Sequence, residues 1–389
     1  KLATGAEPYL AAIVSRRRDD SAQMTMGIQF LFNKYKVEVI HGRGSVLGPG
    51  KVSAEDKILE TKRILIATGA KPNSLHGAST DGKKIIAYRQ AMVPETIPAT
   101  IAVIGSGAIG TELAYFYHSL GSKVTIIEYM DQLVPTEDAD VAALLSRSFR
   151  KAGIQVMTSA RVKSADKSVG GCRLEVETKK GTEFIDADVV LSATGVVPNT
   201  SNLGLKEAGV KMERERIIVD KNFMTSVPGI YAAGDVLPTP ALAHLASAEA
   251  LCCVERMAGL DVPDVDYANI PGCIYATPEI ASVGLREKDA KVKGIEVSIG
   301  KFPFTASGKA ATAGEREGFV KLIFNAQDSR LAGAHIIGAH ATEMIGGLVA
   351  CIGMKIKDMD LARTVFPHPT MSEGIMEAAA LACGHCVNL

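Results

Sequence analysis

The chain has 389 residues, too many for one compact core, and its length predicts two or three domains. Its 43 Lys and Arg residues balance 43 Asp and Glu residues, so no net field favours nucleic acid or an anionic membrane as a partner. No apolar run approaches about 18 residues and no signal-peptide pattern is present. The seven cysteines form no dense framework, so we expect an intracellular protein in a reducing compartment, without a membrane partner.

Three patterned segments come before residue 75. Residues 16–36 (RRRDDSAQMTMGIQFLFNKYK) show helical periodicity, and residues 37–47 (VEVIHGRGSVL) are typical of strand pieces. The three Arg and two Asp that open the first of these segments are interpreted as a solvated helix face. The apolar segment ILIATGA, residues 64–70, predicts a strand that ends in Ala-Thr-Gly.

The segment IAVIGSGAIG, residues 101–110, has the glycine spacing of a dinucleotide-binding turn between a strand and a helix. Gly105 permits the tight turn, Gly107 lets the backbone approach a pyrophosphate, and Gly110 lets the helix pack closely on the sheet. The pyrophosphate would then lie on the helix N-terminus, whose free amides favour an anion. A glycine-rich turn without a ligand is the alternative, but the strand, the helix and a second strand, KVTII, are all in register.

Glu128 closes that second strand and follows Gly110 by 18 residues, close to the usual offset of about 20. Its carboxylate can accept hydrogen bonds from both ribose hydroxyls. A 2′-phosphate would instead require an Arg nearby, and the two residues after Glu128 are Tyr and Met. The sequence therefore favours NAD over NADP.

The segment VVLSATGVVPN, residues 189–199, repeats the Ala-Thr-Gly ending at domain scale. The second copy begins at Ala193, 88 residues after Gly105. The same interval counted back from Ala67 falls before Lys1, so the first copy should have a glycine fingerprint that this chain does not contain. We expect either that the sequence is a fragment or that the N-terminal portion was never present.

Residues 229–389 differ in pattern from the segments before them. Residues 229–236 (GIYAAGDV) predict a strand that ends in Asp, and a helix follows over residues 241–259. Pro263, Pro271 and Pro278 then mark a boundary. Residues 265–389 alternate strands such as FVKLIF with long helices and carry no nucleotide fingerprint, which indicates an interface or substrate role.

Seven segments together resemble the flavin-dependent pyridine nucleotide disulfide reductases, over essentially the whole chain. They are IAVIGSGAIGTELA, the two ATG strands, GIYAAGDV, IPGCIYATPEIASVG, GAHATEMIGG and FPHPTMSEGIMEAA. Within that family, EYMDQLVPTEDAD and the ATEMI helix start are most similar to the dihydrolipoamide dehydrogenases. The resemblance implies oxidation of protein-bound dihydrolipoamide to lipoamide, with electrons passing through FAD to NAD.

The same resemblance implies an α/β fold with two Rossmann-like three-layer dinucleotide-binding domains, the first incomplete, and a C-terminal α+β dimerisation domain. Its expected parts are the remainder of an FAD-binding domain at 1–97, an NAD-binding domain at 98–222, an FAD-domain return segment at 223–264 and an interface domain at 265–389. It implies a homodimer and a lipoyl-bearing acyltransferase of a 2-oxo acid dehydrogenase complex as partner. The cytoplasm is the expected location, or the mitochondrial matrix in a eukaryote.

The resemblance also implies cofactor contacts for individual residues. The resemblance assigns Asp235 to the FAD ribityl chain and the start of the following helix to the flavin pyrimidine edge, where the helix dipole stabilises negative charge. For the Ala-Thr-Gly strand alone, a plain strand end is the alternative. Besides the glycine turn, Glu128 and Glu112, the implied contacts are Gly44, Thr68, Gly69, Asp235, Leu242, Ala243 and His244 for FAD, and Val162 and Gly195 for NAD.

Glu112 matches a family glutamate that pairs with a lysine beside the flavin, and that lysine would lie in the absent N-terminal part. An ordinary polar residue in the first turns of the helix is the alternative. Ala108 stands where the family often has Tyr or Ile over the flavin, so the nicotinamide pocket would be less shielded here.

His368 and Glu373 match the family motif HPTxxE, in which the histidine deprotonates a thiol and the glutamate orients and charges the imidazole. The chemistry needs a base because the thiolate is the nucleophile in disulfide exchange. Imidazole is suited because its unperturbed pKa is near 6.5. The same letters also form a capping box, with Thr370 as N-cap and Glu373 three residues later. In the family this histidine reaches the flavin site of the partner subunit.

The family's CxxxxC redox disulfide is absent from this sequence. Without it, the chain as given should not turn over a dithiol by the family route. Cys383 and Cys386 form a CGHC motif, which belongs at a helix N-terminus in thioredoxin-like enzymes but here follows a helix, so an incidental pair is the simpler interpretation. Cys252 and Cys253 are interpreted as helix-packing residues. No metal-binding residues are assigned.

Two other functions stay open. A chain without the redox disulfide could hold NAD and dimerise without disulfide chemistry. A related NADH-dependent flavoprotein reductase with another acceptor, such as a metal ion or a quinone, would use the same scaffold.

Overall fold

The computed structural model describes residues 9–168 and 170–386. They form two compact units, each built from two stretches of sequence. Unit 1 combines the described residues up to Asn73 with Gly195–Val265, and unit 2 combines Ser74–Thr194 with Asp266–Leu389 as far as it is described. The chain therefore passes from one unit to the other at 73/74, 194/195 and 265/266. The expected domain bounds at 97 and 222 stay predictions.

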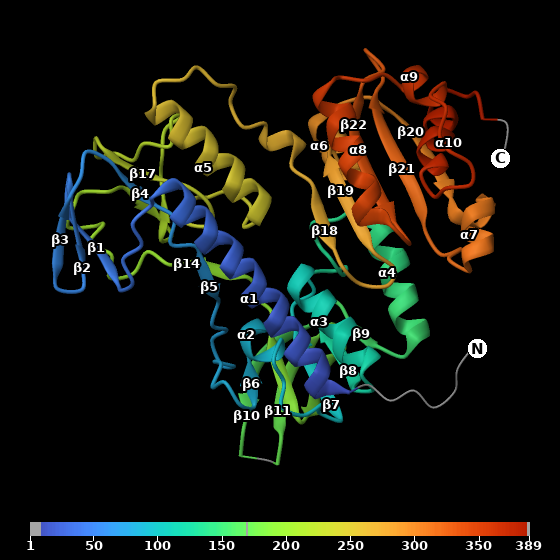
Figure 1. Cartoon of the computed structure of the whole chain (residues 1–389). Coiled ribbons are helices and arrows are strands. Elements are labelled where there is room, and N and C mark those ends of the chain that lie inside the picture. The colour runs from blue at the N-terminus through green and yellow to red at the C-terminus, as the bar shows by residue number, and fades with distance from the viewer. Residues whose placement is uncertain (1–8, 169, 387–389) are drawn as a thin grey trace. The chain divides into compact units, whose positions relative to one another are not determined.

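Unit 1 begins with the long helix that the sequence predicts, although it starts earlier, at Leu10. The helix ends where Lys36 adopts the left-handed conformation with φ 55°. Strand structure was expected from residue 37 but begins only at Gly44. The elements of unit 1 are α1 (Leu10–Tyr35), β1 (Gly44–Gly48), β2 (Lys51–Ala54), β3 (Lys57–Glu60), β4 (Ile64–Ile66), β5 (Ala70–Pro72), β14 (Val196–Pro198), β15 (Met212–Glu213), β16 (Arg216–Ile217), β17 (Ile230–Ala232) and α5 (Ala243–Met257) (Figure 1).

The strand pair β4 and β17 lies at the centre of unit 1. The two strands are parallel, with Ile64 opposite Ile230 and Ile66 opposite Ala232. Their apolar side chains pack with Val236 and with Cys253 of α5 in one buried cluster. Since parallel strands end at the same edge, the residues that follow β4 and β17 meet there. The remaining strands form the antiparallel sheets β1-β2-β3, β5-β14 and β15-β16.

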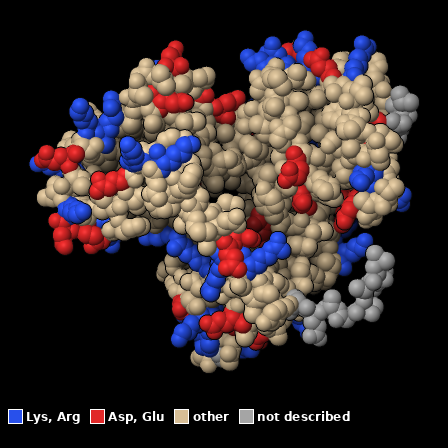
Figure 2. Space-filling view, in the orientation of Figure 1, with Lys and Arg blue, Asp and Glu red and all other residues tan. Residues whose placement is uncertain are grey.

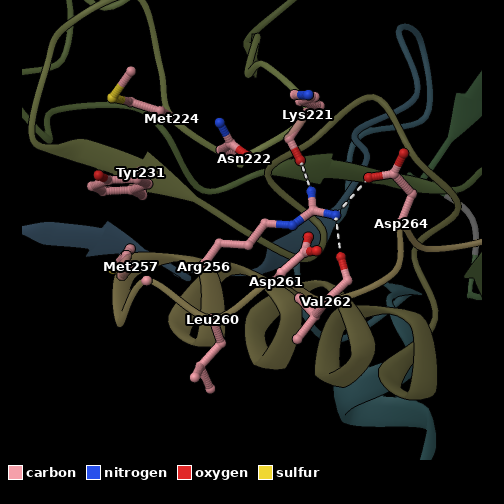
Figure 3. A pocket seen from close by; sticks show the side chains of 11 residues that line it. Lys221, Asn222, Met224, Tyr231, Arg256, Met257, Leu260, Asp261, Val262 and Asp264 are labelled. Carbon is pink, nitrogen blue, oxygen red and sulfur yellow. Dashed lines mark hydrogen bonds and ion pairs between the residues drawn. The ribbon is translucent and has the colours of Figure 1, made fainter.

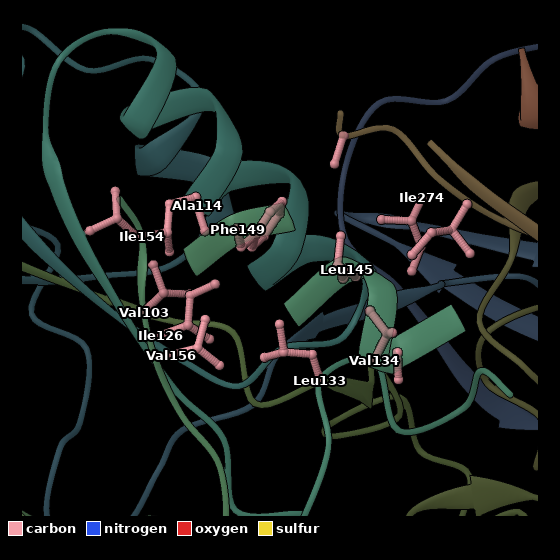
Figure 4. Packing of buried hydrophobic residues seen from close by; sticks show 14 of the residues in the cluster. Val103, Ala114, Ile126, Leu133, Val134, Leu145, Phe149, Ile154, Val156 and Ile274 are labelled. Atoms are coloured by element: carbon pink, nitrogen blue, oxygen red, sulfur yellow. The ribbon is translucent and has the colours of Figure 1, made fainter. Parts of the chain in front are cut away.

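The first part of unit 2 is a five-stranded parallel sheet in the order β6-β13-β7-β8-β9, with helices packed on it. Figure 4 shows the core beneath them, where Phe149 of one helix packs with Ala114 of another and with Val103 and Ile126 of the sheet. The elements are β6 (Ile85–Ile86), α2 (Tyr88–Ala91), β7 (Thr100–Ile104), α3 (Ala108–Ser119), β8 (Lys123–Ile127), α4 (Ala139–Ala152), β9 (Gln155–Met157) and β13 (Val189–Ser192). A three-stranded antiparallel sheet accompanies them, made of β10 (Arg161–Asp166), β11 (Cys172–Thr178) and β12 (Gly181–Ala187).

The second part of unit 2 is a five-stranded antiparallel sheet in the order β18-β19-β22-β21-β20. The segment FVKLIF, predicted as a strand, forms the first six residues of β21, and all six are buried. The elements are β18 (Gly272–Ile274), β19 (Ile280–Gly284), α6 (Glu287–Lys293), β20 (Val297–Pro303), α7 (Gly308–Ala313), β21 (Phe319–Asn325), β22 (Leu331–Ile337), α8 (Ala341–Gly353), α9 (Asp358–Ala362) and α10 (Glu373–Ala382), with short 3₁₀ turns at Tyr267–Asn269 and Phe304–Ala306. The mixed α/β architecture expected from the sequence is confirmed.

The balanced charge of the sequence is visible at the surface. On the face drawn in Figure 2, basic and acidic side chains are interspersed. Among the described residues, no helix combines the length and the apolar character needed to cross a membrane.

Candidate functional site

The turn at residues 105–110 joins β7 to α3 as the glycine spacing predicts. Gly105 has φ +95°, and a Cβ there would lie 2.5 Å from the carbonyl oxygen of Ala193. A Cβ on Gly110 would lie 2.0 Å from the carbonyl oxygen of Gly105. Both positions therefore require glycine for the fold itself.

Gly107 differs from these two glycines. It is the N-cap of α3, its φ is −65°, and a Cβ placed on it would meet no atom within 4 Å. No residue that the structure describes therefore requires a glycine here, whereas a ligand that approaches the backbone closely would require one. No side chain caps the N-terminus of α3. An anion site at a helix N-terminus needs backbone N–H groups that no side chain caps, and this end of α3 meets that condition.

Glu128 directly follows β8 and reaches this turn. One carboxylate oxygen, Oε2, accepts hydrogen bonds from the backbone N–H and the hydroxyl of Ser106, at 2.8 and 2.7 Å. The other oxygen, Oε1, accepts the N–H of Met130 at 2.8 Å, and the residue is only 6% exposed. Each carboxylate oxygen can accept more than one hydrogen bond, so Oε1 keeps acceptor capacity for a ribose hydroxyl. Sequence reasoning missed Ser106, whose only signal is a hydroxyl residue within the glycine motif.

The two other predicted NAD contacts are less distinctive. Val162 lies in β10 and is buried in an apolar cluster with Leu174 and Val176, so its side chain is a core residue. Gly195 has φ +92° and belongs to unit 1, where its carbonyl accepts the N–H of Asn73 at 3.0 Å.

Predicted FAD contacts lie at the carboxyl edge of β4 and β17 in unit 1. The Thr68 hydroxyl donates to the carbonyl of Asn199 at 2.7 Å, and the carbonyl of Gly69 accepts the N–H of Asn199 at 2.8 Å. The Asn199 side-chain amide donates in return to the carbonyl of Thr68 at 3.1 Å. Asp235 follows β17 and is partly exposed. Gly44 is the first residue of β1.

The helix α5 begins eight residues after Asp235, with Leu242 as N-cap and Ala243 as its first residue. No side chain caps this end, and the third predicted contact, His244, is exposed in the first turn. Glu249, fully buried on α5, accepts the N–H of Gly234 at 2.8 Å. This contact fixes the turn at Gly234 and Asp235, and no motif in the sequence marks Glu249 for that role.

Glu112 lies on α3 in unit 2. Its Oε1 accepts the backbone N–H of Tyr275 at 3.0 Å. Burial raises the pKa of Glu112, and this hydrogen bond opposes the effect only in part. Glu112 therefore contacts the segment between β18 and β19, and both the predicted role beside the flavin and the alternative of an ordinary polar residue stay open.

His368 and Glu373 form the pair that the HPTxxE motif predicts. The distance from Nδ1 of His368 to Oε1 of Glu373 is 2.9 Å, while Oε2 of Glu373 accepts the N–H of Thr370 at 2.8 Å. Burial acts to raise the pKa of Glu373, but the hydrogen bonds from Thr370 and His368 outweigh it and lower the pKa. With Nδ1 engaged by the carboxylate, Nε2 is the ring nitrogen left for a substrate, and the His368 side chain is 78% exposed.

The predicted capping box at this helix is only half correct. The helix α10 begins at Glu373, with Ser372 as N-cap, so Thr370 is not the cap. The Thr370 hydroxyl donates instead to the carbonyl of Pro367 at 2.8 Å. Glu373 still accepts the N–H of Thr370, which is the reciprocal half of such a box. The carboxylate thus serves the backbone and the imidazole together.

All seven cysteines are free thiols. Cys383 is the C-cap of α10, where the helix dipole disfavours a thiolate, and burial raises its pKa. This is the opposite of the helix N-terminus that a reactive CxxC motif needs. Cys252 and Cys253 are buried in α5, and burial raises the pKa of Cys253 to about 11, as expected of packing residues.

A cavity of about 640 Å³ opens at the C-terminal end of α5 (Figure 3). There Arg256 donates to the carbonyls of Lys221 and Val262 and pairs with Asp264, so it fastens the loop that follows the helix. None of the predicted site residues lines this cavity. We assign Arg256 a structural role and propose no ligand for the cavity. Among the residues described, no group of three or more His, Cys, Asp or Glu side chains is arranged to hold a metal ion.

Comparison with known proteins gives the following similarities. A family model described as pyridine nucleotide-disulphide oxidoreductase matches residues 2–250, and the model of that family's dimerisation domain matches residues 270–379. The chain is 40% identical to dihydrolipoyl dehydrogenase of Rhizobium etli, over 98% of the chain and 84% of that protein. It is 38% identical to leghemoglobin reductase of Glycine max, over 96% of the chain and 73% of that protein.

A solved structure agrees with these sequence similarities. The crystal structure of LpdA from Mycobacterium tuberculosis matches with a TM-score of 0.88 at 29% identity, covering 96% of this chain and 83% of that one. The ranges matched by the two family models include the 105–110 turn, Asp235 and the pair His368 and Glu373.

Proposed function

Because the chain belongs to the pyridine nucleotide-disulphide oxidoreductase family, we propose that it oxidises protein-bound dihydrolipoamide to lipoamide. Members of this family use FAD, and its dihydrolipoyl dehydrogenases use FAD and NAD. The protein acts as a homodimer, a proposal supported by the dimerisation-domain match at residues 270–379. Its partner is the lipoyl-bearing acyltransferase of a 2-oxo acid dehydrogenase complex, in the bacterial cytoplasm or the mitochondrial matrix.

The observation that carries this proposal is the 2.9 Å contact between Nδ1 of His368 and Oε1 of Glu373. A carboxylate at Nδ1 fixes the imidazole in the tautomer whose Nε2 has a free lone pair. Nε2 can therefore take the proton of a dihydrolipoamide thiol and leave a thiolate, the nucleophile of disulfide exchange. The carboxylate stabilises the imidazolium that results.

Oxidation of the dithiol releases two electrons and two protons. His368 can accept one of the protons. The electrons require a disulfide acceptor. The seven cysteines of this chain include no pair with the family's CxxxxC spacing. The proposal for the residues of this chain is therefore limited to the proton step and to cofactor binding.

The residues of unit 1 that follow β4 and β17 suit FAD. Thr68 and Gly69 are held by Asn199, Asp235 is held by the Gly234 turn, and the N-terminus of α5 has no side-chain cap. FAD held by these residues would supply two-electron redox chemistry between the dithiol and NAD⁺. Leu242, Ala243 and His244 would direct the positive end of the α5 dipole toward the flavin and so favour its anionic reduced form.

The 105–110 turn of unit 2 suits NAD. Gly107 leaves open space beside the first amides of α3, and Glu128 supplies a buried carboxylate. The pyrophosphate would rest on those amides, and Oε1 of Glu128 would accept the adenosine ribose hydroxyls. Val162 and Gly195 are the weaker proposed contacts.

A second candidate is supported by the similarity to leghemoglobin reductase, a related protein with another acceptor. Flavin absorbance with one FAD per chain supports the flavoprotein proposal, and purified protein without flavin that cannot be reconstituted contradicts it, leaving only NAD binding. Steady-state rates with NADH and lipoamide, a quinone, ferric ion or a haem protein then separate the acceptors. For a protein that carries the family's CxxxxC disulfide as well as these residues, we expect lipoamide to give the highest kcat/KM, and a higher value for another acceptor overturns the assignment.

A further inference from the structure

A group of four charged side chains, two of them buried, lies in unit 2, away from the pair His368 and Glu373. At its centre Nζ of Lys321 contacts Oδ2 of Asp138 at 2.9 Å, and both side chains are only 3% exposed. The lysine also reaches Oε2 of Glu287 at 2.6 Å and Oδ2 of Asp140 at 3.4 Å. We call Asp138, Asp140, Glu287 and Lys321 the ionic cluster.

The cluster joins two parts of the chain that are distant in sequence. Asp138 is the N-cap of α4, in the segment that leads away from β8. Lys321 lies in the middle of β21, a strand whose residues are otherwise apolar apart from its last, and Glu287 opens α6. The ion pair therefore fastens the start of α4 to the C-terminal sheet over a sequence separation of 183 residues.

Neighbouring groups fasten the same segment. Nη1 of Arg286 donates to the carbonyl of Thr136 at 2.9 Å. His335, 1% exposed on β22, lies 3.9 Å from Oδ2 of Asp138 and contacts the carbonyl of Leu285 at 3.0 Å. Burial lowers the pKa of His335 and so favours its neutral form, which leaves Lys321 as the cation that faces Asp138. A buried ion pair adds little net stability over an apolar pair. We therefore expect this pair to fix the position of the α4 N-terminus rather than to stabilise the fold.

The other end of the segment is fastened at the 105–110 turn. The N–H of Val134 lies 3.2 Å from both the carbonyl and the hydroxyl oxygen of Ser106. The same hydroxyl donates to Glu128. Leu133 and Val134 are buried in the core cluster that Figure 4 draws. The segment between Glu128 and Asp138 is thus held by Ser106 at one end and by Lys321 at the other.

We propose that Asp138 and Lys321 are positioning residues for the nucleotide site: they anchor the segment that holds Glu128 and Ser106 in register. This inference rests on the proposed NAD site at residues 105–110 and Glu128. If the anchor is loosened, Val134 no longer holds the Ser106 hydroxyl in place, and the carboxylate of Glu128 loses its fixed orientation. The consequence is weaker binding of the dinucleotide, with no direct contact between the ionic cluster and the ligand.

The test measures the Kd of NAD⁺ by isothermal titration calorimetry on the oxidised FAD-loaded protein. Asp138→Asn keeps the N-cap oxygen of α4 but removes the charge that pairs with Lys321, and we expect the Kd to rise about five-fold, or ~1 kcal/mol. Glu287→Gln is the matched control, because it removes another carboxylate from Lys321 without releasing α4. We expect its Kd to stay within about two-fold of the wild type.

Two further variants separate the possible failures. Glu128→Ala must weaken NAD⁺ binding; if it does not, the nucleotide-site proposal fails and this inference fails with it. If Glu128→Ala weakens binding and Asp138→Asn does not, only the positioning role is overturned. Leu348→Ala, a core change in α8, lowers Tm without touching the segment; an equal rise in Kd there also overturns the inference. If Asp138→Asn does not accumulate, Arg286→Gln releases Thr136 and carries the same expectation.

Discussion

Glu373 is the residue on which the orientation of His368 depends, because it is the only carboxylate that contacts Nδ1 among the described residues. Its pKa is lowered from the usual value of 4.5, so it is ionised at neutral pH. We predict that Glu373→Gln lowers kcat for dihydrolipoamide at least about ten-fold, because the amide neither fixes nor charges the imidazole as well. Stopped-flow or steady-state assays measure this directly.

The same variant has a defined pH signature. A carboxyl group with a lowered folded pKa contributes stability above its unfolded pKa and loses it as pH falls through the folded value. The Tm difference between the wild type and Glu373→Gln should therefore be present at pH 7 and disappear well below pH 4.5. A difference that persists in acid means that the hydrogen bonds to His368 and Thr370 do not depend on the charge.

Single residues also mark the limit of prediction from sequence. The motif HPTxxE places His368 and Glu373 five residues apart, so their contact could be predicted locally. Glu249 and Lys321 could not be predicted, because each looks like an ordinary helix or strand residue until the fold buries it against Gly234 or Asp138. Thr370 failed as a cap because α10 starts two residues later than the pattern suggested.

In the β7–α3 turn, glycine is required at position 110 by the fold and at position 107 by the proposed ligand, so substitutions at the two positions should have different effects. Gly110→Ala places a Cβ against the carbonyl of Gly105, and we expect a loss of about 1–3 kcal/mol in the free energy of unfolding. Gly107→Ala meets no atom within 4 Å, so Tm should be unchanged while the Kd of NAD⁺ rises. Thermal unfolding and calorimetry on both variants check this. Unchanged NAD⁺ affinity in Gly107→Ala means that no ligand approaches this backbone.

Elements with strong local signals were predicted best. The strand, glycine turn and helix at 101–119 and the strands β4, β13 and β17 lie where apolar runs and Ala-Thr-Gly or Gly-Asp endings indicate them. Residues 37–43 were wrongly expected to form a strand, since β-branched residues there have no neighbouring strand with which to pair. The division into units at 73/74 and 194/195 depends on contacts between distant segments and leaves no local signature.

For the whole molecule, the central expectation is a homodimer through the C-terminal part. Val365 is 94% exposed and lies three residues before His368, within the range matched by the dimerisation domain. We predict that Val365→Asp shifts the protein from dimer to monomer in light scattering, because a charge replaces an apolar contact. Val292→Asp, an equally polar change at an 80% exposed site on the charged helix α6, should stay dimeric. Identical masses for the two variants contradict this interface.

The most direct test of the proposed function compares two activities of His368→Ala in the intact enzyme. If His368 is the base for the dithiol, NAD⁺ reduction by dihydrolipoamide falls strongly, by about 10²-fold or more, whereas NADH oxidation by an artificial electron acceptor stays near the wild-type rate. The second activity needs both nucleotide sites but no thiol deprotonation. An equal loss of both activities, or full retention of the first, contradicts the role assigned to His368.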